Sequence, residues 1–284
     1  MSYKVLLIPP LILGMTAASI AQTPTVQEYF QNLKSGAAVP SDQELLSVVD
    51  QIANMNQNAL KYALPPIFEA LKLDGTAAVQ AAFALTVVAE RKDSGDLLGD
   101  RIPEIAALLS RVDPRFKSFA ALVFVRVTSV PNDVVIRILS KFILTGTAPA
   151  ADKIPPAGAL IARAPTAPET ERSLLYLLGL PLDTEPRIRL LNGVGTGQIK
   201  SEKIIDAVAQ SLNNSDDDIA LAATQSITRM GPVAVVRCTA MLSKLALDST
   251  RSEPVRRLAQ NALDNTTENC RTLNGLHKVA CPAP

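Results

Sequence analysis

This chain of 284 residues has 27 acidic side chains, but nothing in the sequence selects a pair of them for acid–base chemistry, because the relevant distance is spatial. His277 is the single histidine, and it lies close to the C-terminus. A Ser-His-Asp or Cys-His site would have to use it, and general-base catalysis needs a base held firmly beside its nucleophile. The chain also lacks the Cys-x-x-Cys and His-Glu-x-x-His patterns of the usual zinc sites. We therefore expect no catalytic residue, no metal ligand and no cofactor, and predict that the protein is not an enzyme.

Two short segments resemble ligand-binding loops but lack their defining residues. Asp216, Asp217 and Asp218 could begin a calcium loop, yet the following glycine and the bidentate glutamate are missing. The segment from Gly193 to Gly197 contains three glycines, but it has neither a preceding strand nor the Gly-Lys-Ser of a phosphate-binding loop. We interpret the first segment as a helix cap with acidic residues favoured by the helix dipole, and the second as the end of a helix.

The three cysteines divide into two kinds. Cys270 and Cys281 lie in a polar C-terminal stretch, and an exported protein meets an oxidising compartment, so they are a candidate disulfide. Cys238 shares a helical spacing with Leu242 and Leu245, which indicates a buried face and an inert thiol.

The N-terminus has the features of a cleavable export signal. A short positive region precedes the apolar stretch 5–15, and the small residues Ser19 and Ala21 suit signal peptidase. Pro9 and Pro10 interrupt the apolar stretch, which is shorter than the roughly 20 residues of a membrane-spanning helix. We expect cleavage after Ala21, no stable membrane insertion afterwards, and a periplasmic or extracellular location.

Charge gives no sign of a nucleic-acid partner. The chain has 28 basic and 27 acidic residues, and Lys4 lies in the predicted leader, so the remainder carries about zero net charge. Such a chain exerts no long-range attraction on nucleic acid or on an anionic membrane. With 48% hydrophobic residues, only 4% aromatic residues and no tryptophan, the core must be built from Ala, Leu, Val and Ile, which favours close helix packing.

Apolar segments of helical periodicity alternate with short breaks rich in Pro, Gly, Asp and Ser, and we predict pairs of helices. Second helices are expected to begin near Asp74, Asp113, Asp152, Glu185, Asp216 and Ser252. First helices are expected over 57–73, 100–111, 132–144, 169–180, 201–212 and 232–247, after an N-terminal capping pair over 25–33 and 41–54. Equivalent positions of the second helices lie 31 to 39 residues apart. This period is typical of a solenoid, in which a pair buries its apolar face only against its neighbours.

The start of the last second helix, Ser252-Glu-Pro-Val-Arg256, is followed by Ala259, Ala262 and Leu263, and this pattern resembles HEAT repeats. Weaker copies begin at Asp113 and Asp216. Lys117 and other residues stand where the family has arginine, and the copy at Asp152 has proline at the aliphatic position. The resemblance implies an all-α, right-handed superhelix whose second helices line a concave face, and a role in binding macromolecules.

Three charged residues occupy the start of second helices: Lys117, Arg189 and Arg256. In HEAT-like arrays this position commonly bridges to the turn of the preceding repeat. The alternative is that these charges line the concave face and bind acidic partners.

The predicted organisation is a signal peptide over 1–21, a helical repeat array over 22–265 and a tail over 266–284. The proline-rich stretch 147–168 is a candidate hinge, and the degenerate copies near Asp152 and Glu185 are where we expect the least regular architecture. The favoured function is an exported, non-catalytic scaffold for a protein or peptide partner. A structural envelope component or homo-oligomer is the alternative, and a lyase-like enzyme or assembly factor on the same helices is a further one.

The leader generates a direct prediction. Because the small residues at 19 and 21 suit signal peptidase, the exported protein is expected to begin at Gln22. N-terminal sequencing of protein recovered from outside the cytoplasm checks this, and an exported chain that retains Met1 would contradict it.

Overall fold

The computed structural model describes residues 24–35, 41–197 and 199–273, with side chains up to residue 265. Within these ranges the chain forms helices and no strand, arranged as antiparallel pairs. The first helices are α1 (Val26–Lys34), α3 (Gln57–Leu71), α5 (Ser94–Leu98) with α6 (Ile102–Ala107), α8 (Asn132–Thr145), α10 (Pro168–Leu178), α12 (Glu202–Gln210), and α14 (Pro232–Arg237) with α15 (Thr239–Leu247). The second helices are α2 (Asp42–Asn54), α4 (Gly75–Glu90), α7 (Pro114–Arg126), α9 (Ile154–Arg163), α11 (Thr184–Thr196), α13 (Asp217–Met230) and α16 (Glu253–Leu273).

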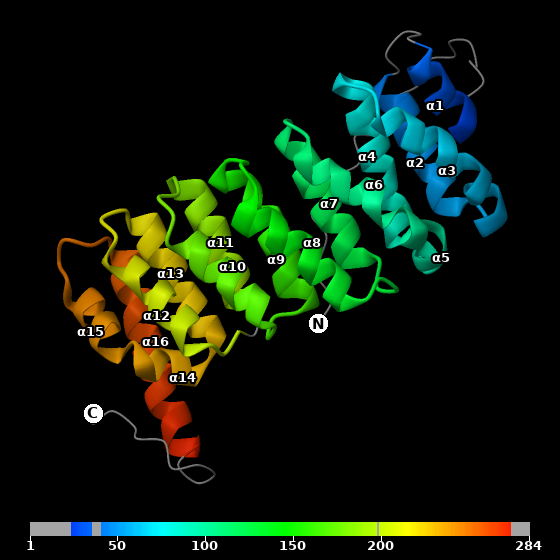
Figure 1. Cartoon of the computed structure of the whole chain (residues 1–284). Helices are drawn as coiled ribbons and strands as arrows, with labels where there is room; N and C mark the ends of the chain where they lie inside the picture. The colour runs from blue at the N-terminus through cyan, green and yellow to red at the C-terminus, as the bar shows by residue number, and fades with distance from the viewer. Residues whose placement is uncertain (1–23, 36–40, 198, 274–284) are drawn as a thin grey trace, which may run out of the picture.

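The pairs stack side by side into an elongated array that runs from α1 to α16 (Figure 1). Each second helix contacts the second helix of the next pair, from α2 through to α16. One apolar cluster runs through the whole stack, from Val26 to Ala262. The predicted all-α solenoid is therefore confirmed, with each pair burying its apolar face against its neighbours.

The predicted starts of the second helices are correct to within two residues, although the caps are not all as expected. The first helix predicted over 100–111 begins earlier, at Ser94. Asp113 and Asp216 accept hydrogen bonds from the backbone N–H groups of Arg115 and Asp218, both at 2.9 Å, as N-caps should. Asp74 precedes α4 without a capping hydrogen bond. Asp152 lies in a 3₁₀ turn, η3 (Ala150–Lys153), one turn before α9, so its predicted capping role is wrong.

The irregular part of the array is not where the sequence indicated. The pairs that contain the degenerate copies, α8 with α9 and α10 with α11, are formed by unbroken helices. The breaks fall in two first helices. One is divided by the 3₁₀ turn η1 (Gly99–Arg101) between α5 and α6, and it ends in a second 3₁₀ turn, η2 (Leu108–Ser110). The other ends and restarts at Cys238. Degenerate helix starts therefore did not produce degenerate packing, because burial of the apolar face decides helix stability more than the cap does.

The stretch 147–168 is anchored on both sides. Pro155 and Pro156 occupy the first turn of α9, where proline loses no hydrogen bond. The carboxylate of Asp152 lies 3.4 Å from Nζ of Lys117 in the preceding pair, and α9 also packs against α11. The hinge stays a prediction, and these contacts tie the stretch to its neighbours.

Both ends of the array present polar residues. Outward positions on α1 include the exposed Gln27 and Gln31, and those on α16 include the exposed Arg257 and Gln260. Terminal repeats of solenoids need such polar outer surfaces. The helix α16 continues to Leu273, so the expectation of a non-helical stretch directly after Asn265 was wrong. Residues 266–273 contain neither glycine nor proline, and nothing in them stops a helix.

The second helices approach each other through small side chains. Ala78, Ala81 and Ala82 in α4, and Ala120 and Ala121 in α7, are all buried. The helices α11 and α13 approach closely at Gly195, where an added Cβ would lie 2.7 Å from Cα of Ser226. Only glycine allows that separation.

Replacement of Gly195 by alanine is expected to destabilise the array by about 1–3 kcal/mol, because the added Cβ meets backbone rather than a flexible side chain. Gly158→Ala is the matched control, since Gly158 also lies inside a second helix but has no atom within 4 Å of its would-be Cβ. That control should gain up to about 1 kcal/mol from helix propensity. Urea and thermal unfolding followed by circular dichroism measure both, and equal stability of the two variants would contradict the close packing.

Candidate functional site

One face of the array is formed by the exposed surfaces of α2, α4, α7, α9, α11, α13 and α16, and we call it the second-helix face. Two hollows open on it, one between α2 and α4 and one between α9 and α11. Both lie at the C-terminal ends of their helices, and so along the same edge of the second-helix face.

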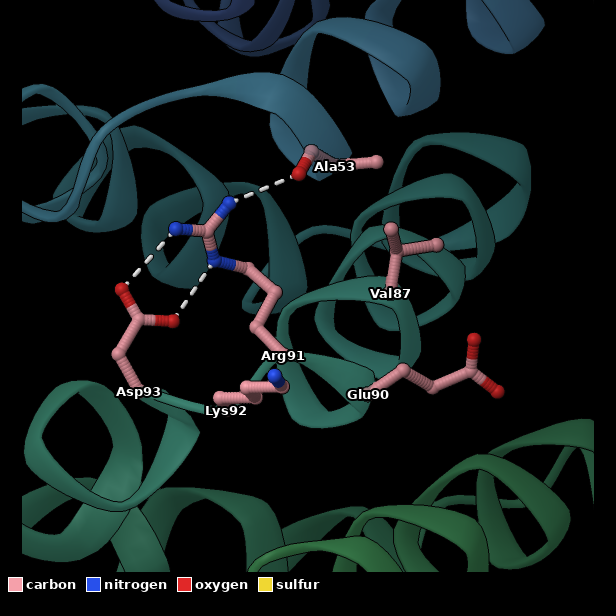
Figure 2. Close-up of a pocket in the computed structure, with 6 residues that line it drawn as sticks. All are labelled: Ala53, Val87, Glu90, Arg91, Lys92 and Asp93. Carbon is pink, nitrogen blue, oxygen red and sulfur yellow. Dashed lines mark hydrogen bonds and ion pairs between the residues drawn. The ribbon is translucent and has the colours of Figure 1, made fainter.

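The first hollow has a volume of about 490 Å³, and four of its six lining residues are charged (Figure 2). It is lined by Ala53, Val87, Glu90, Arg91, Lys92 and Asp93. Nε and Nη2 of Arg91 donate to the two carboxylate oxygens of Asp93 at 2.9 Å, and this bond holds the pKa of Asp93 below its usual value. Nη1 of the same guanidinium donates to the carbonyls of Ile52 and Ala53 at the end of α2. Arg91 is therefore engaged in holding α4 to α2.

The second hollow has a volume of about 470 Å³ and is mostly apolar. It is lined by Gly158, Ile161, Ala162, Pro165, Gly193, Thr196 and Gly197. Glycine and alanine place no side chain over this part of the surface, which leaves the space between α9 and α11 open. Its one polar side chain, Thr196, donates its hydroxyl to the carbonyls of Asn192 and Gly193 in its own helix.

The glycine-rich segment therefore has a different role from the predicted one. Gly193 and Gly195 lie inside α11, and only Gly197 caps its end. Gly195 permits the contact with α13, whereas Gly193 forms part of the hollow on the other side of the helix. The sequence predicted the helix end within a few residues but missed these two packing roles.

Next to the second hollow lies an arginine that has no carboxylate partner among the residues that the structure describes. Arg229, at the end of α13, is exposed, and its Nη1 lies 3.4 Å from Oδ1 of Asn192 in α11. Asn192 and Thr196 are one helical turn apart, and the Thr196 hydroxyl bonds the Asn192 carbonyl. The guanidinium of Arg229 is thus one turn of α11 away from the rim of the hollow.

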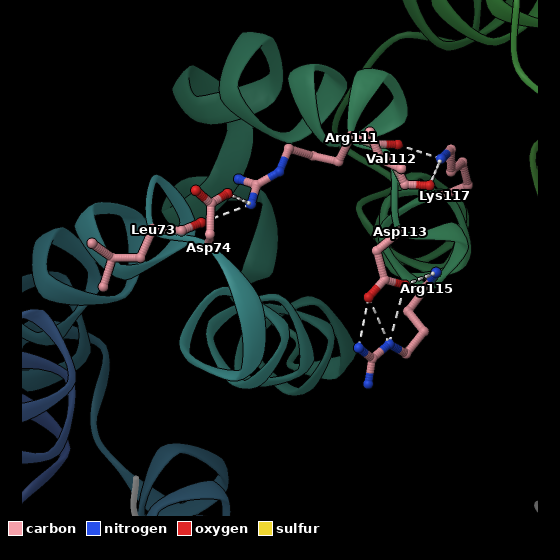
Figure 3. Close-up of polar contacts among 7 residues, drawn as sticks. All are labelled: Leu73, Asp74, Arg111, Val112, Asp113, Arg115 and Lys117. Atoms are coloured by element: carbon pink, nitrogen blue, oxygen red, sulfur yellow. Dashed lines mark hydrogen bonds and ion pairs between the residues drawn. The ribbon is translucent and has the colours of Figure 1, made fainter. Parts of the chain in front are cut away.

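The three charged residues singled out from the sequence do not come together. Lys117 is buried and donates to the carbonyls of Arg111 and Val112 (Figure 3). It also pairs with Asp152 in the next repeat. Arg189 is exposed and pairs with Glu185 one turn earlier in α11. The half-buried Arg256 has an Nε without a hydrogen-bond partner in the described part of the chain. Of the two suggested roles, Lys117 has the bridging one, although its ion pair is with the following repeat.

Four arginines that the sequence reasoning did not select satisfy carbonyls at helix ends: Arg91, Arg111, Arg163 and Arg187. Arg111 donates to the carbonyls of Leu71 and Leu73 at the end of α3, both at 2.7 Å, and to Asp74 (Figure 3). Arg187 donates to the carbonyls of Leu178 and Leu180 at 2.6 Å. The last carbonyls of a helix have no partner within it, and a planar guanidinium can reach two of them together.

Arg163 is the most connected of these four residues. Its Nη1 donates to the carbonyls of Phe124 (2.6 Å) and Val127 (3.0 Å), and its Nη2 to that of Val130 (2.6 Å). Its Nε donates to Oδ1 of Asn132. Burial lowers the pKa of Arg163. One sequence signal could have identified Arg163. It is a basic residue at the end of a second helix, some 35–40 residues after the end of the preceding second helix.

Other predicted residues have simpler outcomes. His277 and Cys281 lie outside the described residues, as does the side chain of Cys270. The thiol of Cys238 is buried, and its burial raises its pKa to about 11, which agrees with the predicted inert thiol. Within the described ranges, no group of three or more His, Cys, Asp or Glu side chains is placed to hold a metal ion. None of the helices in the described ranges has the length and apolar character to cross a membrane.

No protein-family model and no curated protein matches this chain. Among solved structures, it is similar to an engineered protein from a structural genomics consortium, with 16% identity, a TM-score of 0.47, and coverage of 85% of this chain and 68% of that chain. It is also similar to a designed armadillo repeat protein in complex with the peptide (KR)4, with 17% identity, a TM-score of 0.37, and coverage of 85% and 99%. The class of this protein, an all-α solenoid, follows from its own stacked helix pairs.

Replacement of Arg163 by methionine is expected to destabilise the array by about 2 kcal/mol or more, because three carbonyls lose a charged donor. Arg163→Lys should recover part of the loss, since an ammonium donates from a single point. Arg189→Met, which removes an exposed pair within one helix, is the control and should change stability by less than about 0.5 kcal/mol. Thermal unfolding, with amide exchange over residues 124–130, measures the effect, and equal losses for Arg163→Met and Arg189→Met would refute the capping role.

Proposed function

We propose that this protein is an exported, non-catalytic, HEAT-like scaffold that binds a protein or peptide partner along the second-helix face. The observation that carries the proposal is the pair of hollows on one edge of a continuous row of second helices. Hollows of roughly 300–1,000 Å³ are of the size that accepts side chains or small ligands.

The surface is suited to binding because its shape is fixed before a partner arrives. Arg91 holds α4 to the end of α2, and Arg163 holds α9 to the end of α7. A preorganised surface loses less conformational entropy on association than a mobile one.

The groups around the hollows favour contact rather than reaction. Arg91 and Asp93 pair with each other, Glu90 pairs with Arg126 at 3.5 Å, and the Thr196 hydroxyl donates to its own helix. In neither hollow do the lining residues include a base beside a nucleophile. The polar outer positions of α1 and α16 count against end-to-end assembly into a homo-oligomer. Export rests on the apolar leader over 1–21.

Site-specific photo-crosslinking tests which face is used. A photoreactive phenylalanine at Ala162, on the rim of the second hollow, should give an adduct in the native envelope or culture fluid. The same residue at Tyr62, which is 79% exposed on the first helix α3, is the control and should give none. An adduct from Tyr62 alone, or from neither position, would refute binding through the second-helix face. An adduct of twice the chain mass would identify a second copy as the partner.

A further inference from the structure

We propose that the partner segment bound by the second-helix face is an acidic, extended peptide of roughly ten to twelve residues, with an aliphatic side chain in the hollow between α9 and α11. This inference rests on the proposed function and adds the chemistry of the ligand.

The first argument is the balance of charge along the edge from α4 to α13. In the C-terminal halves of α4, α7, α9, α11 and α13 and in residues 91–93, the acidic residues are Glu90 and Asp93, and each is paired with an arginine. Lys92 and Arg229 are exposed and have no ion pair with any residue that the structure describes. Within this set of residues the charges left over are both positive, which complements carboxylates on a ligand.

The second argument concerns the helix ends themselves. The C-terminus of a helix carries a partial negative charge that would repel an acidic ligand. Guanidinium groups offset this charge on α2 and α7, because Arg91 and Arg163 donate to the carbonyls there. The ends of α2 and α7 are therefore more favourable to carboxylates than bare helix ends would be.

The third argument is the character of the hollow beside Arg229. Its lining is glycine, alanine, proline and isoleucine apart from Thr196, so it suits an aliphatic side chain. When one ligand residue occupies the hollow, the next residue of the ligand lies about one turn of α11 from the Arg229 guanidinium. A ligand with an aliphatic residue beside an aspartate or glutamate could therefore fill the hollow and pair with Arg229 together.

The length follows from helix spacing. Lys92 follows α4 and Arg229 ends α13, with α7, α9 and α11 between them. Packed helices lie roughly 8–10 Å apart, so the two cations are separated by roughly 30–40 Å. At about 3.3–3.6 Å per residue, an extended peptide needs roughly ten to twelve residues to reach both.

Selection from a display library of random 12-residue peptides on the folded chain tests the proposal. Enriched peptides are expected to be net acidic and to contain an aliphatic residue beside an acidic one. Fluorescence anisotropy on one enriched peptide then measures its affinity for four variants. Arg229→Met should weaken binding about five- to ten-fold, and Arg189→Met, whose arginine is already paired with Glu185, should leave it unchanged.

Two further variants test the hollow. Gly158→Leu adds a side chain into the second hollow where no atom lies within 4 Å of the new Cβ, and it should weaken binding at least ten-fold. Ala107→Leu adds the same side chain at an exposed position on α6 and should have no effect. Melting temperatures show that each variant is folded.

The outcomes separate the two proposals. If the enriched peptides are neutral or basic, and Gly158→Leu still weakens their binding, the proposal of an acidic ligand is overturned. The proposal that the second-helix face binds a partner then stands. If an acidic peptide has the same affinity for Arg229→Met as for Arg189→Met, the proposal of an acidic ligand is overturned as well. If no peptide is enriched over an empty matrix, both proposals are overturned. If the protein self-associates and Gly158→Leu abolishes this, the occupant of the hollow is a second copy of the chain and the acidic-peptide proposal is overturned.

Discussion

Each second helix lies against the second helix of the next pair at a distance set by alanine and glycine. This close approach buries the apolar faces that no single pair can bury alone, and it gives the array one continuous core. One such close contact is Gly195 against Ser226, where the Ser226 hydroxyl also donates to the carbonyl of Leu191 at 2.8 Å. A side chain at position 195 would separate the helices, so the local sequence and the spacing of the stack are coupled.

The helix pairs could be predicted from sequence because their signals are local. Apolar periodicity marks the buried face, and Asp, Pro or Gly marks the breaks, as at Asp113 and Asp216, where the expected caps are present. The C-terminal extension of α16 was missed for a related reason. A polar stretch without proline or glycine has no periodic signal, yet it can continue a helix already begun at Glu253.

The interactions between pairs could not be predicted in the same way, because their partners are carbonyl groups and every residue has one. Arg163 donates to carbonyls 33 to 39 positions earlier in the chain. The residue types at those positions do not predict the contact. Lys117 was noticed only because it occupies a position of a known repeat pattern. The second hollow was missed too, since Gly158 and Gly193 line it together only once α9 and α11 are packed.

Stability and the candidate binding surface arise from the same small residues. Where two second helices pack through glycine and alanine, the buried side gains a close contact, and the solvent side loses the side chains that would cover it. In α11 these two effects lie two residues apart, at Gly195 and Gly193. The arginines act in the same double manner, because a guanidinium that satisfies helix carbonyls also brings positive charge to the edge where the hollows open. Packing requirements alone thus produce an edge with two hollows, one of them lined mainly by glycine, alanine, proline and isoleucine. The same edge carries two cations, Lys92 and Arg229, that have no ion pair in the described part of the chain.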